Sequence, residues 1–468
     1  MSSLANPLVA ACLGAAAGLY LPGASPLPGF TAVLLRGCAF LAAAVGLTLL
    51  GFPPARNGEK PGGEASRRPR GAWVVIAAAG LFSGTAVGRG LELREASRFF
   101  GLPPEAVVRV EGRILEDSRP RRGGGRAARL RALRCFDRRG NEAGASTDLP
   151  VFFPAGPPLF WGDRVVLEGR LARGRDGKPV FFVSAGEGLR PQRRNRFFAI
   201  RAGILLRARE RIGGIREDWA ALFAALFLGL QDDLDPAVSE SFRRAGVVHI
   251  LALSGMHLGI LVVLVRLVLR PFAAGVLGTL LCAGAVGLYT FVAGPRPSLL
   301  RAAAMYLLHE GLCRAGRRPE TAALLAFSFL ASCLLTPEDL HSSSFILSYL
   351  AMGGILIFSR RLKRFLYPLI PDPLGSAVAM SLAAQLVTAP YLLAAFGSLQ
   401  PAAVPASVLL GPLTAAFLWL GVPGFLLAGV STSAEAAVQG LLFPMQYLYT
   451  AIVATADFFS RFPPWGGG

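Results

Sequence analysis

Long apolar runs recur along this chain, close to the length that a helix needs to cross a lipid bilayer. Such a crossing takes about 20 apolar residues. Of the 468 residues, 53% are hydrophobic and only 16% are charged, a balance too apolar for a soluble domain of this size. We therefore expect a polytopic α-helical integral membrane protein with about 11 spans. The runs lie near residues 4–21, 30–52, 72–90, 247–269, 272–292, 297–313, 321–336, 345–359, 375–396, 403–428 and 434–458.

An insert with a different pattern separates the third run from the fourth. It contains five short stretches, several of them alternating, between turns rich in Gly, Pro and Arg, which is typical of β-strands. The stretches lie at 107–115, 128–133, 149–153, 165–171 and 180–183. Five strands, two of them containing Gly, suit a small closed barrel of the OB type, and a fragment of a β-sandwich is the alternative. We therefore expect an inserted small β-barrel (OB-like) extracytoplasmic domain over 100–192.

The segment 196–232 is expected to lie at the membrane surface. Residues 196–216 mix Phe197, Ile200, Ile204 and Leu205 with arginines, as in a basic amphipathic helix in the lipid interface. The apolar stretch 219–230 is too short to cross comfortably, so a re-entrant or interfacial position is expected.

Basic connections between the spans predict the orientation, because cytoplasmic loops are enriched in Lys and Arg. The connections 53–71, 314–320 and 360–373 carry basic clusters and fall on one side, whereas 22–29, 337–344 and 397–402 contain no Lys or Arg. The N-terminus is therefore expected in the cytoplasm and the β domain outside. Three spans then form an N-terminal unit at 1–92, and the remaining spans form a second unit at 240–460.

The overall charge points to an anionic partner. The chain has 48 Lys and Arg against 29 Asp and Glu, a formal net charge of +19. Lipid headgroups, nucleic acid, or both would be attracted. The alternative is that base composition alone produced the excess of Arg.

The run that begins near Val247 places polar side chains at bilayer depth. Within one helix, Ser254 and His257 would share a face, and His249 would lie two turns earlier. Polar groups at this depth usually face the helix bundle or a wet cavity. The alternative is hydrogen bonding between helices, with Gly255 and Gly259 permitting close packing.

A second unusual stretch runs from Tyr289 to Arg301. Gly294, Pro295 and Pro297 would end one helix, and Ser298 could cap the next. Arg296 and Arg301 would then sit at a helix N-terminus, where the helix dipole disfavours cations unless they share an anion. This pattern predicts a phosphate-binding corner. In the alternative, Arg301 extends to the outer headgroups.

Other polar residues and motifs predict little chemistry. Gln385 and Thr388 are three apart in a predicted helix and fit packing better than ligand binding. The chain has no Gly-x-x-x-x-Gly-Lys-Ser/Thr loop, no His-Glu-x-x-His and no Cys-x-x-Cys. We therefore expect no catalytic residue, no metal site and no cofactor, and we do not expect an enzyme.

The stretch Gly246-Val-Val-His249-Ile-Leu-Ala252-Leu-Ser254-Gly255-Met-His257 resembles the Gly-x-x-His-x-x-Ala-x-Ser-Gly-x-His signature of the ComEC family of competence proteins. The resemblance covers roughly residues 220–415, and the β insert falls where that family places an OB-like domain outside the cell. Further similar segments are Ala225-Leu-Phe-Leu-Gly229, Ser298-Leu-Leu-Arg301-Ala302, Leu334-Leu-Thr-Pro337, Phe345-Ile-Leu-Ser-Tyr349 and Ala384-Gln385-Leu-Val-Thr388-Ala-Pro390.

The resemblance implies a channel in the bacterial cytoplasmic (inner) membrane that translocates single-stranded DNA during natural transformation. A DNA receptor and a cytosolic ATPase are implied as partners beside membrane lipids, and a separate nuclease is a further candidate. Arg129 and Arg131 would attract phosphates, while Phe152, Phe153 or Trp161 would stack on bases. The candidates for the DNA path are His249, Ser254, Gly255, His257, Arg296, Ser298, Arg301, Gln385 and Thr388.

Two departures from the family pattern limit what the resemblance implies. No His-x-His-x-Asp-His motif occurs before the sequence ends at Gly468, so the nuclease activity proposed for many members is not carried over. Ala406-Ser407-Val408 stands where the family often has an Asn. The alternatives are a transporter or channel for a smaller anionic or lipid-linked solute, since broken helices serve that role equally well, and an enzyme fragment that has lost a nuclease half.

Overall fold

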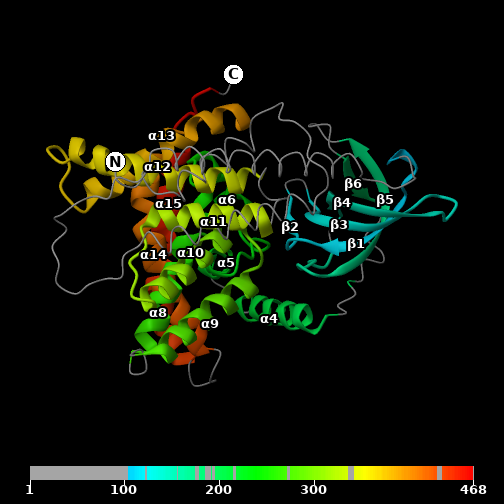
Figure 1. The fold of residues 1–468 in the computed structure, drawn as a ribbon, viewed down its shortest axis with the longest axis horizontal. Helices are drawn as coiled ribbons and strands as arrows, with labels where there is room; N and C mark the ends of the chain where they lie inside the picture. Colours follow the sequence, from blue (N-terminus) through cyan, green and yellow to red (C-terminus); the bar gives the residue numbers. More distant parts are fainter. Residues whose placement is uncertain are drawn as a thin grey trace, which may run out of the picture.

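The computed structural model describes residues 104–466, apart from 122–123, 155, 174–178, 185–190, 192–194, 214, 216–217, 271–274, 336–341 and 429–434. The three runs expected at 4–21, 30–52 and 72–90, and the unit expected at 1–92, lie outside these residues. A β-barrel lies at one end of a larger helical body, and α4 runs beneath the barrel toward that body (Figure 1).

The β domain is a closed barrel of five strands with a short sixth strand attached. β1 pairs antiparallel with both β3 and β5, which closes the ring β1-β5-β6-β4-β3. The β4–β6 pairing is parallel, and β2 adds to the edge of β3. Each of the five predicted stretches overlaps a different strand of the ring, so the expected small barrel is confirmed. A short helix η2 (Pro104–Ala106) precedes β1 (Arg109–Ile114), β2 (Arg119–Pro120), β3 (Arg126–Phe136), β4 (Glu142–Phe153), β5 (Arg164–Arg173) and β6 (Pro179–Val183).

The barrel interior is filled by the alternating apolar residues that the strand pattern predicted. Leu130, Leu149 and Phe181 have no exposed surface, and they lie on three different strands. Gly112 permits β1 to approach β3, because a Cβ there would lie only 2.4 Å from the Arg131 carbonyl oxygen. A side chain at this position would force the two strands apart, and the ring could not close as it does.

The helical body consists of twelve named helices in the described residues. They are α4 (Arg196–Gly213), α5 (Asp218–Phe227), α6 (Pro236–Arg244), α7 (Val248–Leu251), α8 (Gly255–Val268), α9 (Val276–Ala293), α10 (Pro297–Arg314), α11 (Thr321–Leu335), α12 (Ser343–Leu366), α13 (Leu374–Phe396), α14 (Ala403–Ala428) and α15 (Glu435–Ser460). Four are long and apolar enough to cross a membrane: α9, α12, α13 and residues 403–425 of α14. The chain is therefore a membrane protein.

The prediction of one helix over 247–269 was wrong. The chain forms α7, leaves the helical conformation at Ala252, and starts α8 only at Gly255. Ser254 has an extended backbone and caps α8 together with His257 in a reciprocal capping box. The apolar residues Ala252 and Leu253 hide this break in the sequence, since they continue the hydrophobic run.

The short helix α5 lies inside the helical body. Eight of its ten residues, from Trp219 to Phe227, are buried, and it contacts α14 and α15. Its core position includes a close approach to α14, where a Cβ on Gly421 would lie 2.6 Å from the Phe223 ring. Of the two positions expected for this segment, the interfacial one is therefore wrong, because most of its surface is covered by protein.

Helix α4 has the expected length but a different buried face. Leu205 is buried, as is Arg201, which has no exposed surface at all. Phe197 is 72% exposed and Ile200 is 59% exposed. The expected position in the lipid interface was therefore wrong for Leu205, which packs with Phe160 and Ala202.

Candidate functional site

A groove of about 570 Å³ lies between the barrel and the helical body. This volume is within the range of about 300–1,000 Å³ that is usual for ligand sites. Both parts of the molecule contribute walls, including the β1–β2 connection, β3, and the chain breaks before α8 and α10. Its polar lining residues are Glu116, Asp117, Arg119, Arg129, Arg131, Trp161, Gln231, Ser239, Arg296, Ser298, Ser342 and Ser344.

Two buried ion pairs join the barrel to the helices at the edge of this groove. Arg201 of α4 donates two hydrogen bonds of 2.7 Å to the Asp117 carboxylate and a third, of 2.8 Å, to the Phe291 carbonyl. Arg126 of β3 donates to Asp232 at 2.8 Å, and both of these side chains are nearly buried. Burial raises the pKa of Asp232, and the nearby Arg126 and Arg209 oppose that shift.

The groove carries more positive than negative charge. It is lined by four arginines and two carboxylates, and one of those carboxylates, Asp117, is paired with Arg201, which lies outside the lining. Arg119 pairs with Glu116 at 3.3 Å, and both are partly exposed. The lining therefore keeps an excess of positive charge after these pairs are counted, and this excess favours an anionic ligand.

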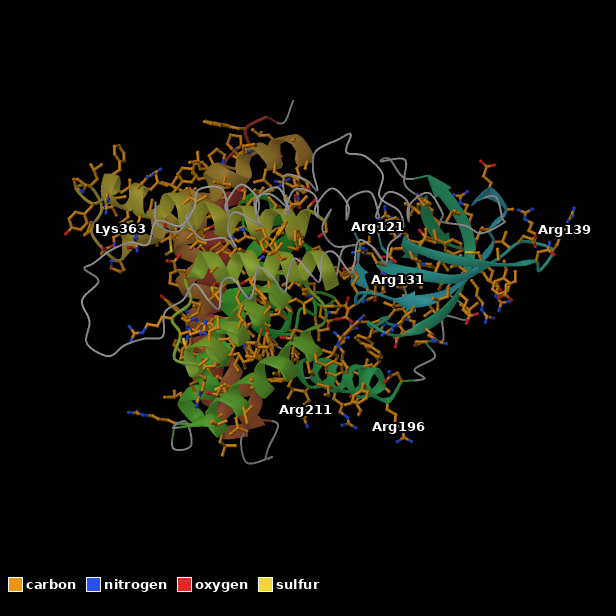
Figure 2. The ribbon with its side chains drawn as sticks, in the orientation of Figure 1. Arg121, Arg131, Arg139, Arg196, Arg211 and Lys363 are labelled. Atoms are coloured by element: carbon orange, nitrogen blue, oxygen red, sulfur yellow. The ribbon has the colours of Figure 1, made fainter. Side chains whose placement is uncertain are left out.

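Like charges are also crowded on the barrel strands beside the groove. In the strand register, Arg113 of β1 is paired with Arg131 of β3 on one side and Arg164 of β5 on the other. Burial, followed by the charges of Arg164 and Arg131, lowers the pKa of Arg113. The Arg113 guanidinium lies 4.5 Å from the Phe198 ring centroid. Figure 2 shows Arg121 and Arg131 on the part of the barrel nearer the helices and Arg139 at the far tip.

Two helices begin at the groove. α9 ends before Gly294, whose φ of 90° requires glycine, and α10 starts at Pro297. Ser298 lies in the first turn of α10 and Arg296 is the N-cap, so the prediction that Ser298 caps this helix was wrong. Ser342 caps α12 and accepts a hydrogen bond from the Phe345 amide at 3.2 Å. Helix N-termini carry partial positive charge and bind anions, which strengthens the preference of the groove.

Arg296 and Arg301 occupy different depths at this corner. Arg296 lines the groove and donates to the Gly229 carbonyl at 3.1 Å. Arg301 lies one turn further along α10, is 8% exposed, and is 3.5 Å from the Ser298 hydroxyl. Its guanidinium lies 5.3 Å from the centre of the Tyr349 ring. The alternative in which Arg301 extends to the outer headgroups does not fit this burial.

The polar residues of the 249–257 segment do not line the groove. His257 is buried, and its Nδ1 lies 2.9 Å from the Ser254 hydroxyl and accepts from the Ser254 amide at 3.1 Å. Gly255 lies close to α10, since a Cβ there would be 3.3 Å from that of Ala302. His249 is exposed on α7. Ser254 and His257 therefore shape the break beside the groove, and the expectation that they share a helix face was wrong because Ser254 precedes the helix.

The aromatic candidates of the barrel differ in accessibility. Phe153 is 3% exposed and belongs to the barrel core, so the prediction that it stacks on bases was wrong. Phe152 points to the other side of β4, packs on Phe182, and lies 4.1 Å below the Arg121 guanidinium. Trp161 lines the groove and packs edge-on against Phe198 at 5.0 Å.

The remaining candidates lie in two places. Arg129 and Arg131 line the groove, and both pair with Asp148, at 3.7 Å and 2.8 Å. Gln385 and Thr388 are not among the lining residues: Gln385 donates to the Gln400 carbonyl at 3.0 Å, and Thr388 donates back to Ala384 in its own helix. Both side chains therefore donate to backbone carbonyls away from the groove lining.

Sequence reasoning missed four residues that shape this site: Asp117, Arg201, Ser342 and Tyr349. The serines directly before the apolar run at 345–359 could have indicated the cap at Ser342. Nothing local could have indicated the Arg201–Asp117 pair, because the two residues are 84 positions apart. No group of three or more His, Cys, Asp or Glu side chains that could hold a metal ion occurs within the described part of the chain.

The fold and the groove together define a helical membrane protein that carries a β-barrel beside a basic groove. A family model described as Competence protein matches residues 226–465, which is just over half of the chain. The chain therefore belongs to this family of competence proteins, as the resemblance to ComEC predicted.

Two relatives show how far the similarity extends. ComE operon protein 3 of Bacillus subtilis (strain 168) is 31% identical over 226 residues, which are 46% of this chain and 27% of that protein. An uncharacterized protein of Aquifex aeolicus (strain VF5) is 28% identical over 199 residues, 42% of this chain and 46% of that protein. The chain thus spans less than half the length of the curated relatives it matches. No solved structure matches it.

Proposed function

We propose that this chain is a channel that translocates single-stranded DNA into the bacterial cytoplasm during natural transformation. One observation supports this role above the others: the basic groove joins the barrel to the helix breaks of the membrane part. A single strand carries one negative charge per nucleotide, and cations that neutralise several phosphates bind it with steep salt dependence. The family membership supports the same role.

The barrel would receive the strand as an OB-type domain. OB folds bind oligonucleotides on their second and third strands and on the loop between the first two. In this barrel those elements correspond to β3, β4 and the segment 115–125, and residues of β3 and of that segment line the groove. Arg129, Arg131 and Trp161 would then contact phosphates and a base.

In the proposed topology the N-terminus is cytoplasmic, the barrel lies outside, and about 11 spans cross the membrane. The basic last turn of α12 supports this orientation, because Lys363 lies there, at the end of the helical body farthest from the barrel (Figure 2). The units would be 1–92, 100–192, 196–232 and 240–460. The chain would act without catalysis of its own, with a DNA receptor, a cytosolic ATPase and a separate nuclease as partners.

Deletion of the gene tests the proposal, with surface-bound and internalised labelled DNA measured separately. We expect binding at the surface to persist and internalisation to fall to background, with recovery on complementation by the full chain. Normal internalisation in the deletion strain would refute the role.

The ligand is tested on the purified full-length chain in lipid nanodiscs. We expect a single-stranded oligonucleotide to bind and its affinity to fall steeply with salt. Absence of binding at low salt, together with binding of a small anion such as inorganic phosphate, would favour a transporter or channel for a smaller anionic or lipid-linked solute.

A further inference from the structure

Arg301 is the most unusual charged residue in the described part of the chain. It is 8% exposed, and its Nε and Nη1 atoms have no hydrogen-bond partner among the described residues. Its Nη2 atom reaches only the Ser298 hydroxyl, at 3.5 Å. A buried charge without a carboxylate is normally avoided, because desolvation disfavours it unless it is paired. The free donors therefore point to a ligand.

Arg301 lies close behind the wall of the groove. Ser298 lines the groove, and it lies three residues before Arg301, on the same face of α10. Arg296 also lines the groove, two residues before Ser298, whereas Arg301 lies just behind the lining residues. A group that enters past Arg296 and Ser298 would meet the Arg301 guanidinium next, at the N-terminal end of α10, where the helix dipole adds to the attraction for an anion.

Tyr349 holds Arg301 without cancelling its charge. The guanidinium lies 5.3 Å from the centre of the ring, a cation–π distance. The ring is itself fixed: its hydroxyl donates to Ser328 at 3.2 Å on α11, and Phe345 packs 4.5 Å away. Contact with a ring face, unlike contact with a carboxylate, leaves the guanidinium with a full charge for a ligand.

We infer that Arg301 forms a phosphodiester-binding subsite behind Ser298 of the groove wall, positioned by Tyr349. The inference rests on the function proposed above, and it identifies where the strand leaves the groove, toward the contact between α10, α11 and α12. Each nucleotide brings one monoanionic phosphate, which matches a single guanidinium with several free N–H donors. Ser328 and Ser332 continue the polar side chains beyond Tyr349, since Ser332 lies 3.4 Å from its hydroxyl.

Purified full-length protein in nanodiscs of zwitterionic lipid provides the first test, with a ten-nucleotide oligothymidylate as the probe. We expect Arg301→Gln to weaken binding about tenfold and to reduce the slope of log affinity against log salt by about 0.7, the loss of one phosphate contact on a single strand. Arg301→Lys should retain the slope and recover part of the affinity, because the charge remains and the planar fork does not.

The matched control is Arg461→Gln, since Arg461 is an exposed arginine outside the groove that pairs only with Asp457 among the described residues. It should leave affinity and slope unchanged. Tyr349→Leu should lower affinity with the slope retained, and Tyr349→Phe should restore affinity, because the ring face remains. These two variants test the subsite even where Arg301→Gln fails to fold.

Two results would overturn the inference, and a third would refute the function on which it rests. Binding by Arg301→Gln with the slope and affinity of Arg461→Gln would show that Arg301 contacts no phosphate of the strand. In nanodiscs containing phosphatidylglycerol, loss of bound lipid from Arg301→Gln with unchanged oligonucleotide binding would assign the subsite to a headgroup. Failure of the unsubstituted protein to bind the oligonucleotide at all would instead refute the proposed function, which keeps the two failures distinguishable.

Discussion

The barrel junction and the N-terminal part of α10 each contain a buried arginine, and the two arginines have different partners. Arg201 is completely buried and donates to two Asp117 oxygens and a backbone carbonyl. Arg301 is almost as buried, and among the described residues it contacts only the Tyr349 ring face and, at 3.5 Å, the Ser298 hydroxyl. Pairing at the junction makes Arg201 a structural residue, whereas the lack of a carboxylate leaves Arg301 available to an anion.

The largest expected effect concerns the junction. Arg201→Ala leaves the Asp117 carboxylate without its partner, which should lower the free energy of unfolding by about 3 to 5 kcal/mol. Thermal unfolding of the protein in nanodiscs measures this loss. A double variant, Arg201→Met with Asp117→Leu, should regain most of the stability, because no charge is then buried alone. A double variant as unstable as the single one would show that the pair is not the cause.

The second prediction is a gain in stability, and it concerns Arg301. Arg301→Leu removes an unsatisfied buried group, so the free energy of unfolding should rise by about 1 to 3 kcal/mol while DNA internalisation falls. The same unfolding measurement, paired with an uptake assay, checks both parts. If Arg301→Leu is destabilised as much as Arg201→Ala, then both arginines stabilise the fold and the difference between them is wrong.

The third prediction concerns the barrel wall of the groove. The double substitution Arg129→Ala and Arg131→Ala should reduce the salt slope of oligonucleotide binding by about 1.4, equivalent to two phosphate contacts on a single strand. Asp148→Asn is the opposite test, because it removes the carboxylate that pairs with these arginines. Because Asp148 pairs with both arginines, its neutralisation should raise affinity. Equal slopes in all three proteins would place the strand elsewhere.

A smaller effect is expected at the start of α8. His257→Ala removes half of the capping box with Ser254 and should lower the free energy of unfolding by about 1 kcal/mol, a typical value for a lost cap. Thermal unfolding measures this difference. A loss of internalisation at full stability would instead give His257 a role in the DNA path.

The smallest expected effect is on the rate at which Cys135 is labelled. This rate distinguishes undocking of the barrel from its unfolding. Burial raises the pKa of Cys135 to about 11, so at pH 8 its reactive thiolate is scarce and maleimide labelling should be slow, with the rate rising as pH increases. In a variant that retains only Cys135, mass spectrometry follows the modification. If Arg201→Ala only undocks the barrel, Cys135 stays protected; rapid labelling would mean that the barrel itself opens.

Most of the elements could be predicted from the sequence because their signals are local. The runs at 375–396 and 403–428 became α13 and α14 within one residue at each end. The break at 252–254 could not be predicted, because Ala252 and Leu253 are apolar and continue the hydrophobic run. The structure shows it through the capping of α8 by Ser254 and His257. Phe152 and Phe153 illustrate another gap. Adjacent strand residues face opposite sides, and the pattern does not say which side is the barrel interior.

Several residues of the site could be predicted from the sequence, but their arrangement could not. Arg129, Arg131, Trp161, Arg296 and Ser298 were singled out from the sequence, and all five line the groove. Their meeting place was not foreseen, because it depends on how the barrel docks against the helices.

By itself, the sequence determined the membrane-protein class, the inserted barrel and the excess of positive charge, since hydrophobic periodicity and composition are properties of neighbouring residues. Only the tertiary structure decided which buried arginines pair with a carboxylate. Arg201 acquires Asp117 from 84 positions away, while Arg301 acquires an aromatic face and, within the described parts of the chain, no carboxylate. The reason is that both the desolvation of a charge and the partner that offsets it depend on the whole packed fold, and a chain segment carries neither alone.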